Sequence, residues 1–279
     1  MSAQHTIAFV TDELKASHAA AIACAVAEGV DTVEIRTIDG ANFMSLSAAQ
    51  QKAAAGELRA AGLKVAGLAT PLLKWGGPGQ PVAALGDQFG FDRAGRGLEE
   101  LAVLAADAAD IFGTRNLRIF SYLTYPGFKL DDLKPACDTL LRLAESRDLT
   151  LHVENEPVCN IMRGSDLLAL MQAYRHPRLR ALLDIGNIYH TGVPPTVGEL
   201  TAVMPYVQHC HFKDYHHASK RYVALGEGSI PYGVFVPACL AAAGGRPLTL
   251  SVETHVPDDQ PDATRRSLRA LRRLVAASA

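Results

Sequence analysis

Four apolar segments in the second half of the chain each lead into a side chain that can bind a metal ion. These side chains are Glu154, Asp184, His211 and Glu253. Three carboxylates and one neutral imidazole suit a hard to borderline divalent cation. Carboxylates that share a poorly hydrated site repel one another, and a divalent cation removes that repulsion. The four residues together therefore predict a site for one divalent ion, with coordination positions left for two substrate oxygens.

The elements that must position these side chains follow a regular alternation. Short apolar runs alternate with longer amphipathic segments eight times along the 279 residues. The predicted strands cover residues 6–10, 32–35, 64–69, 116–122, 150–153, 180–183, 207–212 and 248–252. The predicted helices cover residues 16–28, 48–61, 95–112, 130–147, 165–174, 197–204, 232–243 and 263–277. Strands that are apolar on both faces are typical of a buried parallel sheet.

Eight strand–helix units in a chain of this size predict a single (β/α)8 TIM barrel, one domain spanning residues 1–279. An open doubly wound sheet is the alternative, but no G-x-G-x-x-G follows the first strand. Glycines 29, 62 and 113 are expected to cap helices in the left-handed conformation. Because a barrel carries its chemistry at the carboxyl ends of its strands, the four metal-binding candidates should point toward one axis, and the loop over 76–91 could act as a lid.

Each candidate also has a purely structural interpretation. A lone glutamate at a strand end is more often a cap or an ion-pair residue, and a lone histidine is more often a hydrogen-bonded core residue. Four consecutive strands that end this way favour the joint metal site. His209 shares a strand face with His211, so either imidazole could bind metal. Lys213 has the same parity and could contact substrate, pair with Glu253, or form a surface ion pair with Asp214.

Polar and aromatic residues near other strand ends are candidates for contacts with hydroxyl groups. The residues predicted to bind substrate are Arg36, Lys74, Trp75, His209, Lys213 and Glu227. Trp75 could stack on a sugar face or anchor its loop. No glycine-rich loop that would cradle a phosphate is evident, so a phosphorylated substrate is not indicated.

Composition bounds the partners and the location. The net charge of −2 counts against a nucleic-acid partner. No segment approaches the ~20 apolar residues of a membrane span. The five cysteines include no C-x-x-C pair, which fits reduced thiols in a cytoplasmic protein.

At the residues that carry the chemistry, the sequence resembles the xylose isomerase-like sugar phosphate isomerase/epimerase superfamily over nearly the whole chain. The most specific matches are Val153-Glu154-Asn155, Leu183-Asp184-Ile185-Gly186-Asn187, His211-Phe212-Lys213-Asp214, Gly226-Glu227-Gly228-Ser229-Ile230 and Val252-Glu253-Thr254-His255. The resemblance implies one divalent ion held by Glu154, Asp184, His211 and Glu253, with Glu154 and Glu253 acting also as acid and base. Manganese is the expected ion, with Mg²⁺, Co²⁺ or Zn²⁺ as alternatives, and a homo-oligomer stays open.

The expected activity is a metal-dependent isomerase or epimerase that transfers protons on a sugar or sugar-like polyol through an enediolate. A dehydratase or lyase acting on a keto-sugar or inosose would need the same ligands. An apurinic-site endonuclease, which this superfamily also includes, needs two further metal ions, for which the ends of strands two to four offer no histidine. A non-catalytic binding subunit is disfavoured because such a protein has no reason to keep all four ligands.

Overall fold

The computed structural model describes residues 5–80 and 88–278. Its main sheet consists of eight parallel strands: β1 (Thr6–Phe9), β2 (Thr32–Ile35), β5 (Lys64–Ala69), β6 (Asn116–Ile119), β7 (Thr150–Glu154), β8 (Leu179–Asp184), β9 (Val207–Phe212) and β12 (Thr249–Val252). They pair in the order β1, β12, β9, β8, β7, β6, β5, β2. Val10, directly after β1, forms a parallel bridge with Glu34 of β2, which joins the two ends of the sheet. The predicted (β/α)8 barrel is confirmed.

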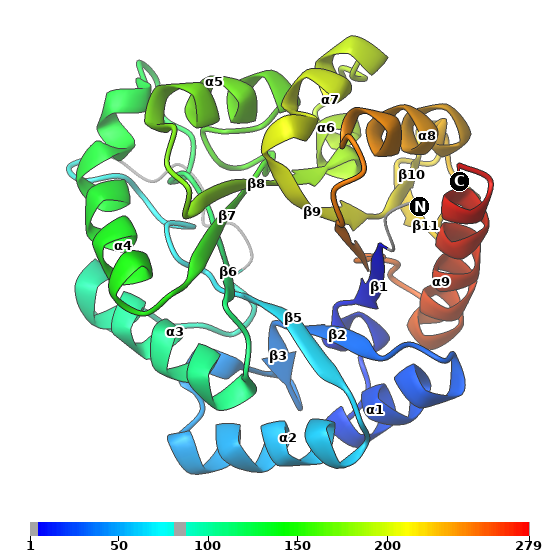
Figure 1. Cartoon of the computed structure of the whole chain (residues 1–279), viewed down its shortest axis with the longest axis horizontal. Helices are drawn as coiled ribbons and strands as arrows, with labels where there is room; N and C mark the ends of the chain where they lie inside the picture. The colour runs from blue at the N-terminus through cyan, green and yellow to red at the C-terminus, as the bar shows by residue number, and fades with distance from the viewer. Residues whose placement is uncertain (1–4, 81–87, 279) are drawn as a thin grey trace.

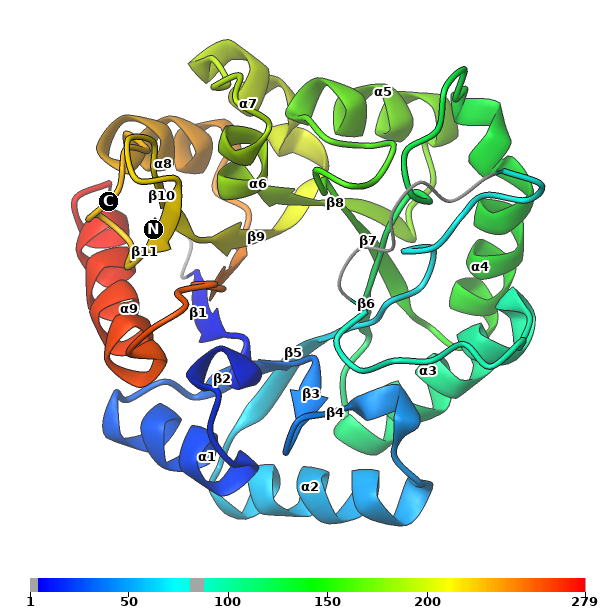
Figure 2. The same ribbon diagram turned by 180° about the vertical axis from the view of Figure 1, so that it is seen from behind.

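The helices form an outer ring around the strands, as Figures 1 and 2 show from its two faces. They are α1 (His18–Ala27), α2 (Ala48–Ala60), α3 (Leu98–Phe112), α4 (Lys134–Ser146), α5 (Gly164–Tyr174), α6 (Ile185–His190), α7 (Val197–Val203), α8 (Tyr232–Ala242) and α9 (Gln260–Ala276). Short 3-10 helices are η1 (Thr11–Leu14), η2 (Phe43–Ser45), η3 (Leu130–Leu133) and η4 (Met204–Tyr206). The hydrophobic core fills the space between this ring and the strands.

Local sequence fixes where several helices begin and end. Ser47 and Gln50 form a reciprocal capping box that starts α2. Gly29, Gly62 and Gly113 follow the ends of α1, α2 and α3 with φ values of 61°, 74° and 71°. These left-handed glycines confirm the predicted helix ends.

Strand β6 is shorter than predicted. Tyr122 lies in the left-handed region with φ of 60°, so the chain turns away from the sheet before this residue. The amides of Phe120 and Tyr122 donate to the carbonyls of Leu72 and Leu73, at 2.9 and 2.8 Å. Hydrogen bonds to the loop after β5 therefore replace the sheet pairing that an apolar run alone would suggest.

Three other features differ from the prediction. The helix predicted over 130–147 is divided into η3 and α4, because Pro135 lies in the first turn of α4. Two hairpins, β3–β4 (Thr37–Ile38 and Ala41–Asn42) and β10–β11 (Asp214–His216 and Arg221–Val223), extend beyond the barrel strands. Helix α6 begins directly at the end of β8, in a stretch for which no helix was predicted.

The predicted lid over 76–91 includes residues 81–87, which lie outside the described residues. Among the helices that the structure describes, none combines the length and the apolar character needed to cross a bilayer.

Candidate metal centre and active site

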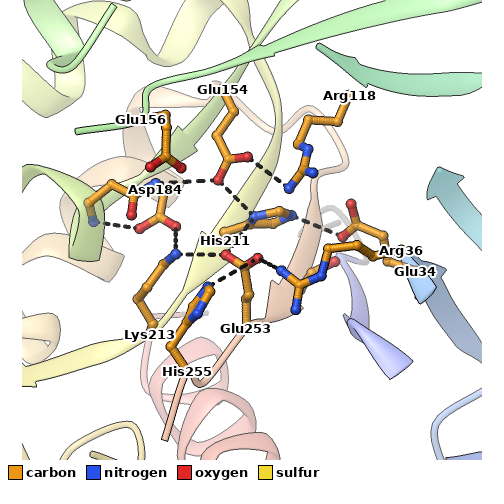
Figure 3. Close-up of polar contacts among 12 residues, drawn as sticks. Glu34, Arg36, Arg118, Glu154, Glu156, Asp184, His211, Lys213, Glu253 and His255 are labelled. Carbon is orange, nitrogen blue, oxygen red and sulfur yellow. Dashed lines mark hydrogen bonds and ion pairs between the residues drawn. The ribbon is translucent and has the colours of Figure 1, made fainter. Parts of the chain in front are cut away.

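The four side chains that the sequence singles out meet at one end of the barrel. Glu154 and Asp184 are the last residues of β7 and β8, His211 lies one residue before the end of β9, and Glu253 directly follows β12. Each offers one ligand atom, and these atoms lie within 4.8 Å of one another. All four residues are at most 2 % exposed. Figure 3 shows the three carboxylates gathered around the His211 imidazole.

A pair of asparagines holds Asp184 in place. The Asn155 side chain accepts from the Asp184 amide and donates to the Asp184 carbonyl, both at 2.8 Å. The Asn187 amide donates to Asp184 Oδ1 at 2.9 Å, which makes Asp184 the N-cap of α6. Oδ1 is thus committed to the helix, whereas Oδ2 is turned toward the centre of the cluster.

The His211 ring stands between carboxylates on both sides. Its Nδ1 atom lies 3.2 Å from Glu154 Oε1 and 3.3 Å from Glu253 Oε2. Its Nε2 atom lies 2.9 Å from Glu34 Oε2, on the opposite side of the ring. The nitrogen that faces the four-residue cluster is therefore Nδ1.

Cationic side chains surround the carboxylates. Arg118 of β6 lies 3.1 Å from Glu154 Oε2. The Lys213 ammonium bridges Asp184 Oδ2 and Glu253 Oε2, at 2.9 and 2.7 Å. These charges reduce the repulsion that three buried carboxylates at close range would otherwise feel.

Burial and neighbouring charges act in opposite directions on the Glu154 and Asp184 carboxyls. Burial alone would raise the pKa of Glu154, but Arg118 and His211 lower this pKa to about 2. At Asp184 burial prevails and raises the pKa to about 6, although Lys213 acts against it. Both groups are predominantly ionised at neutral pH.

Neighbouring charges also outweigh burial in setting the pKa values of the other two members of the cluster. Burial opposes ionisation of Glu253, yet Lys213 and His211 hold its pKa well below the ordinary value. Burial likewise disfavours a charged imidazole, but Glu34, Glu154 and Glu253 raise the pKa of His211 well above its ordinary value. The metal-free cluster therefore combines a protonated imidazole with ionised carboxylates.

The donor set fits a divalent cation. Three carboxylates and one imidazole nitrogen are ligands that Mn²⁺, Mg²⁺, Co²⁺ and Zn²⁺ accept. Among the described residues, the buried oxygens Glu154 Oε2 and Asp184 Oδ2 have no hydrogen-bond partner, although Arg118 and Lys213 lie within ion-pair distance of them. Buried polar atoms without hydrogen-bond partners are uncommon in folded proteins, and a bound cation would satisfy both oxygens.

A cavity of about 180 Å³ opens onto the cluster. Its walls include Lys74, Arg118, Glu156, Lys213, Tyr222 and Glu253. A larger cavity of about 810 Å³ lies beside it and shares two wall residues, Phe89 and His255. Glu253 and Lys213 both line the smaller cavity, so a polar ligand that entered it would contact them.

The structure brings two of the predicted substrate-binding residues to this cavity. Lys74 lines it, with its ammonium 3.5 Å from Glu156 Oε2. Lys213 lines it while pairing with Asp184 and Glu253, so it does not form the alternative surface pair with Asp214. The Asp214 carboxylate instead accepts from backbone amides of the 226–230 turn.

Arg36 and His209 lie close to the cluster, and their side chains are held by contacts with other protein groups. Arg36 pairs with Asp12, Glu13 and Glu253 at 2.9, 2.5 and 2.5 Å and lines the larger cavity. His209 is buried in the barrel interior, where Nε2 lies 2.7 Å from Ser251 Oγ.

Trp75 and Glu227 lie away from the cluster. The Arg93 guanidinium covers the Trp75 ring at 5.0 Å, and Trp75 does not line the cavity. Glu227 is half exposed and pairs with Arg266 of α9 at 2.8 Å, beside a separate groove between α8 and α9. Neither residue touches the predicted metal ligands in the described part of the chain.

Glu13 and Glu34 are site residues that sequence reasoning missed. Glu34 forms a second group of potential ligands with His209 and His211, and Glu13 forms a third with Glu253 and His255. The prediction that further metal ions lack ligands rested on the absence of histidines at the ends of strands two to four. Glu34 lies on β2, and Glu13 lies in η1, which follows β1. Arg36 directly follows β2 and has the same parity as Glu34, and that parity was the available signal.

Comparisons with known proteins agree with this fold. The model of the family described as xylose isomerase-like TIM barrel matches residues 22–274. No curated protein sequence matches the chain.

Three solved structures illustrate the likeness of the fold. An IOLI protein with a bound zinc atom has a TM-score of 0.75 at 14% identity, covering 98% of this chain and 99% of that chain. L-ribulose 3-epimerase has a TM-score of 0.74 at 16% identity, with 99% and 96% covered. A probable 3-DHS dehydratase from Bacillus anthracis has a TM-score of 0.70 at 17% identity, with 96% and 98% covered. The chain belongs to the xylose isomerase-like TIM barrel family.

Proposed function

We propose that this chain is a divalent-metal-dependent isomerase or epimerase that acts on a sugar or a sugar-like polyol. The observation that supports it most is the buried group of Glu154, Asp184, His211 and Glu253, whose ligand atoms lie within 4.8 Å of one another beside a small polar cavity. Mn²⁺ is the ion we propose, with Mg²⁺, Co²⁺ or Zn²⁺ as alternatives. A cytoplasmic location and one domain spanning residues 1–279 stay predictions from the sequence, and a homo-oligomeric state stays open.

A bound divalent ion would supply Lewis-acid stabilisation of negative charge on substrate oxygens. The protein itself supplies the proton carriers. Glu154 and Glu253 both lie beside His211 Nδ1, one above and one below it in the view of Figure 3, and we assign them to proton removal and proton return at carbon beside a carbonyl. Their lowered pKa values keep both carboxylates ionised at neutral pH, so either can take the proton from carbon. The other carboxylate must first take up a proton from solvent, which it then returns to the substrate.

Cationic residues would orient the substrate and these carboxylates. Lys213 holds Glu253 Oε2 at 2.7 Å and faces the cavity, so it can contact a substrate hydroxyl without leaving Glu253. Arg36 holds the other oxygen of Glu253, at 2.5 Å. A carboxylate held at both oxygens keeps one orientation toward the substrate carbon, which reduces the entropy lost in reaching the reactive geometry.

Solvent proton exchange tests this proposal. The Mn²⁺-loaded protein is incubated in D2O with a panel of ketoses, keto-sugars and inososes, and deuterium at carbon is read by NMR. We expect incorporation beside the carbonyl of an accepted substrate. Turnover of any substrate without incorporation of solvent deuterium would count against the enediolate route, and absence of turnover across the panel with every candidate ion would count against the proposed substrate class.

A dehydratase or lyase is the second candidate, and Lys213 favours it. This ammonium lies in the cavity wall next to Glu253, where a third proton-carrying group could protonate a departing hydroxyl. The same D2O experiment separates the two activities, because elimination forms a conjugated product with ultraviolet absorbance and epimerisation does not.

A further inference from the structure

We infer that Glu34, which is not one of the four predicted metal ligands, is a positioning residue that fixes the ring orientation and the proton position of His211. The inference rests on the proposed metal-dependent function, because it concerns how the proposed metal ligand is presented. It does not require any particular substrate or reaction.

The geometry joins residues from distant strands. Glu34 lies on β2 and His211 on β9, and Glu34 Oε2 lies 2.9 Å from His211 Nε2. Glu34 is 1 % exposed and His211 is fully buried, so water does not compete for this contact. Figure 3 shows Glu34 on the side of the imidazole that faces away from Asp184.

The hydrogen bond decides which nitrogen can bind a cation. An ionised carboxylate only accepts hydrogen bonds, so the nitrogen that faces Glu34 must carry a hydrogen. In the neutral ring the lone pair then belongs to Nδ1, which faces Glu154 and Glu253 at 3.2 and 3.3 Å. A carboxylate behind a metal-binding histidine fixes its tautomer in this way and raises its basicity.

A second interior histidine keeps Glu34 from moving. His209 Nε2 lies 3.3 Å from Glu34 Oε2 and 2.7 Å from Ser251 Oγ, and the His152 ring packs edge-on against His209. Glu34 is therefore held among buried polar side chains next to the metal-binding cluster. A rotation of its carboxylate would give up contacts with two imidazoles.

The test compares metal binding in E34A, E34Q and the control E57Q. The E57Q variant makes the same Glu→Gln change at an exposed position of α2, away from His211. The dissociation constant for Mn²⁺ and for Zn²⁺ is measured by competition with a chelator, on proteins whose folding is checked by circular dichroism. The visible absorption of the Co²⁺-loaded proteins reports the ligands around the ion.

We expect E34A to weaken binding roughly 10–100-fold, the range found when the outer partner of a metal ligand is removed. E34Q, whose amide oxygen can still accept from Nε2, should weaken binding less, by about tenfold. Both should shift the Co²⁺ absorption bands, whereas E57Q should leave affinity and bands unchanged. Because Gln is isosteric with Glu, E34Q decides the question even where E34A does not fold.

Two results would overturn the positioning role. The first is an E34Q protein that binds metal as tightly as wild type with unchanged Co²⁺ bands. The second is a wild-type protein with two ions per chain and an E34A protein with one, because Glu34 would then be a ligand itself. A wild-type protein that binds no divalent ion would instead contradict the proposed function.

Discussion

At the scale of single residues, the two glutamates of the cluster have separate tasks that substitution can test. In E154Q and E253Q the amide keeps the size of the side chain but cannot act as a base at neutral pH. We expect turnover to fall by at least ~100-fold, the lower bound of a general acid–base contribution. Metal binding should weaken only in part because three ligands stay in place. Steady-state kinetics together with metal titration measure both effects.

The matched control for these variants is E57Q, an exposed position on α2. It should keep wild-type turnover and wild-type metal affinity. Full turnover in both E154Q and E253Q would remove the two glutamates from the acid–base roles.

Metal binding should also release protons. In the metal-free protein Glu34, Glu154 and Glu253 raise the pKa of His211 above its ordinary value despite burial, so the imidazole is protonated at neutral pH. A ligand nitrogen must lose that proton before it binds an ion. Affinity for the ion should therefore decrease as the pH is lowered. It should decrease further near pH 6, because Asp184, with a pKa of about 6, then becomes protonated.

Calorimetric titration at pH 7 in two buffers of different ionisation enthalpy measures this release. We expect about one proton per bound ion, since His211 carries one to lose. Equal observed enthalpies in the two buffers would contradict the protonated state of His211.

The sequence singled out the four side chains that meet in the cluster but missed the glutamates beside them. Glu154, Asp184, His211 and Glu253 each follow an apolar run, so the position of a strand end was enough to find them. Glu34 and Glu13 lie near strands one and two, where a carboxylate can face the interior or a helix. Only closure of the barrel, which brings β2 across from β9, shows that Glu34 reaches His211.

At the scale of elements, the turn from β8 into α6 determines where Lys213 lies. A Cβ atom at Gly186 would meet the Lys213 side chain and would lie 2.9 Å from the Lys213 carbonyl oxygen. The Lys213 carbonyl is itself fixed by the Tyr232 hydroxyl, which donates to it at 2.6 Å. We expect G186A to destabilise the fold by about 1–3 kcal/mol, as overpacking does, and to lower activity by displacing Lys213.

The matched glycine substitution is G56A in the middle of α2, where an added Cβ meets nothing within 4 Å. It should stabilise the protein by about 0.4–1 kcal/mol because alanine restricts the unfolded chain. Urea unfolding of both variants gives the comparison. A G186A protein as stable and as active as wild type would show that β8–α6 does not constrain Lys213.

The elements themselves were largely predictable because the pattern of apolar residues follows burial. Most residues of the barrel strands are buried between the barrel interior and the helices. The exceptions share a cause. Helix α6 and the hairpins β3–β4 and β10–β11 extend from strand ends, where tertiary hydrogen bonds decide the conformation. The hydrogen bond by which Asp184 caps α6 is one example, and a pattern of apolar residues cannot predict it.

At the scale of the whole molecule, the bound ion should stabilise the barrel because its ligands come from four strands. An ion present at a hundred times its dissociation constant adds about 2.7 kcal/mol to the free energy of unfolding. For a chain of 279 residues that corresponds to an increase in Tm of about 5 °C. Thermal unfolding with EDTA and with added Mn²⁺ measures it, and a Tm independent of added ions would contradict a site that spans four strands.

Closure of the barrel was predicted from eight strand–helix units, and the confirmed strand order explains why one cluster can draw on β7, β8, β9 and β12. These four strands are consecutive neighbours in the sheet. Their carboxyl ends therefore meet without any insertion or second domain.

Anomalous X-ray scattering from crystals of the Mn²⁺-loaded protein tests the central claim most directly. The account predicts one anomalous peak per chain, within coordination distance of Glu154, Asp184, His211 Nδ1 and Glu253. A protein that gives no peak after loading, or a peak bound by other residues, would contradict it.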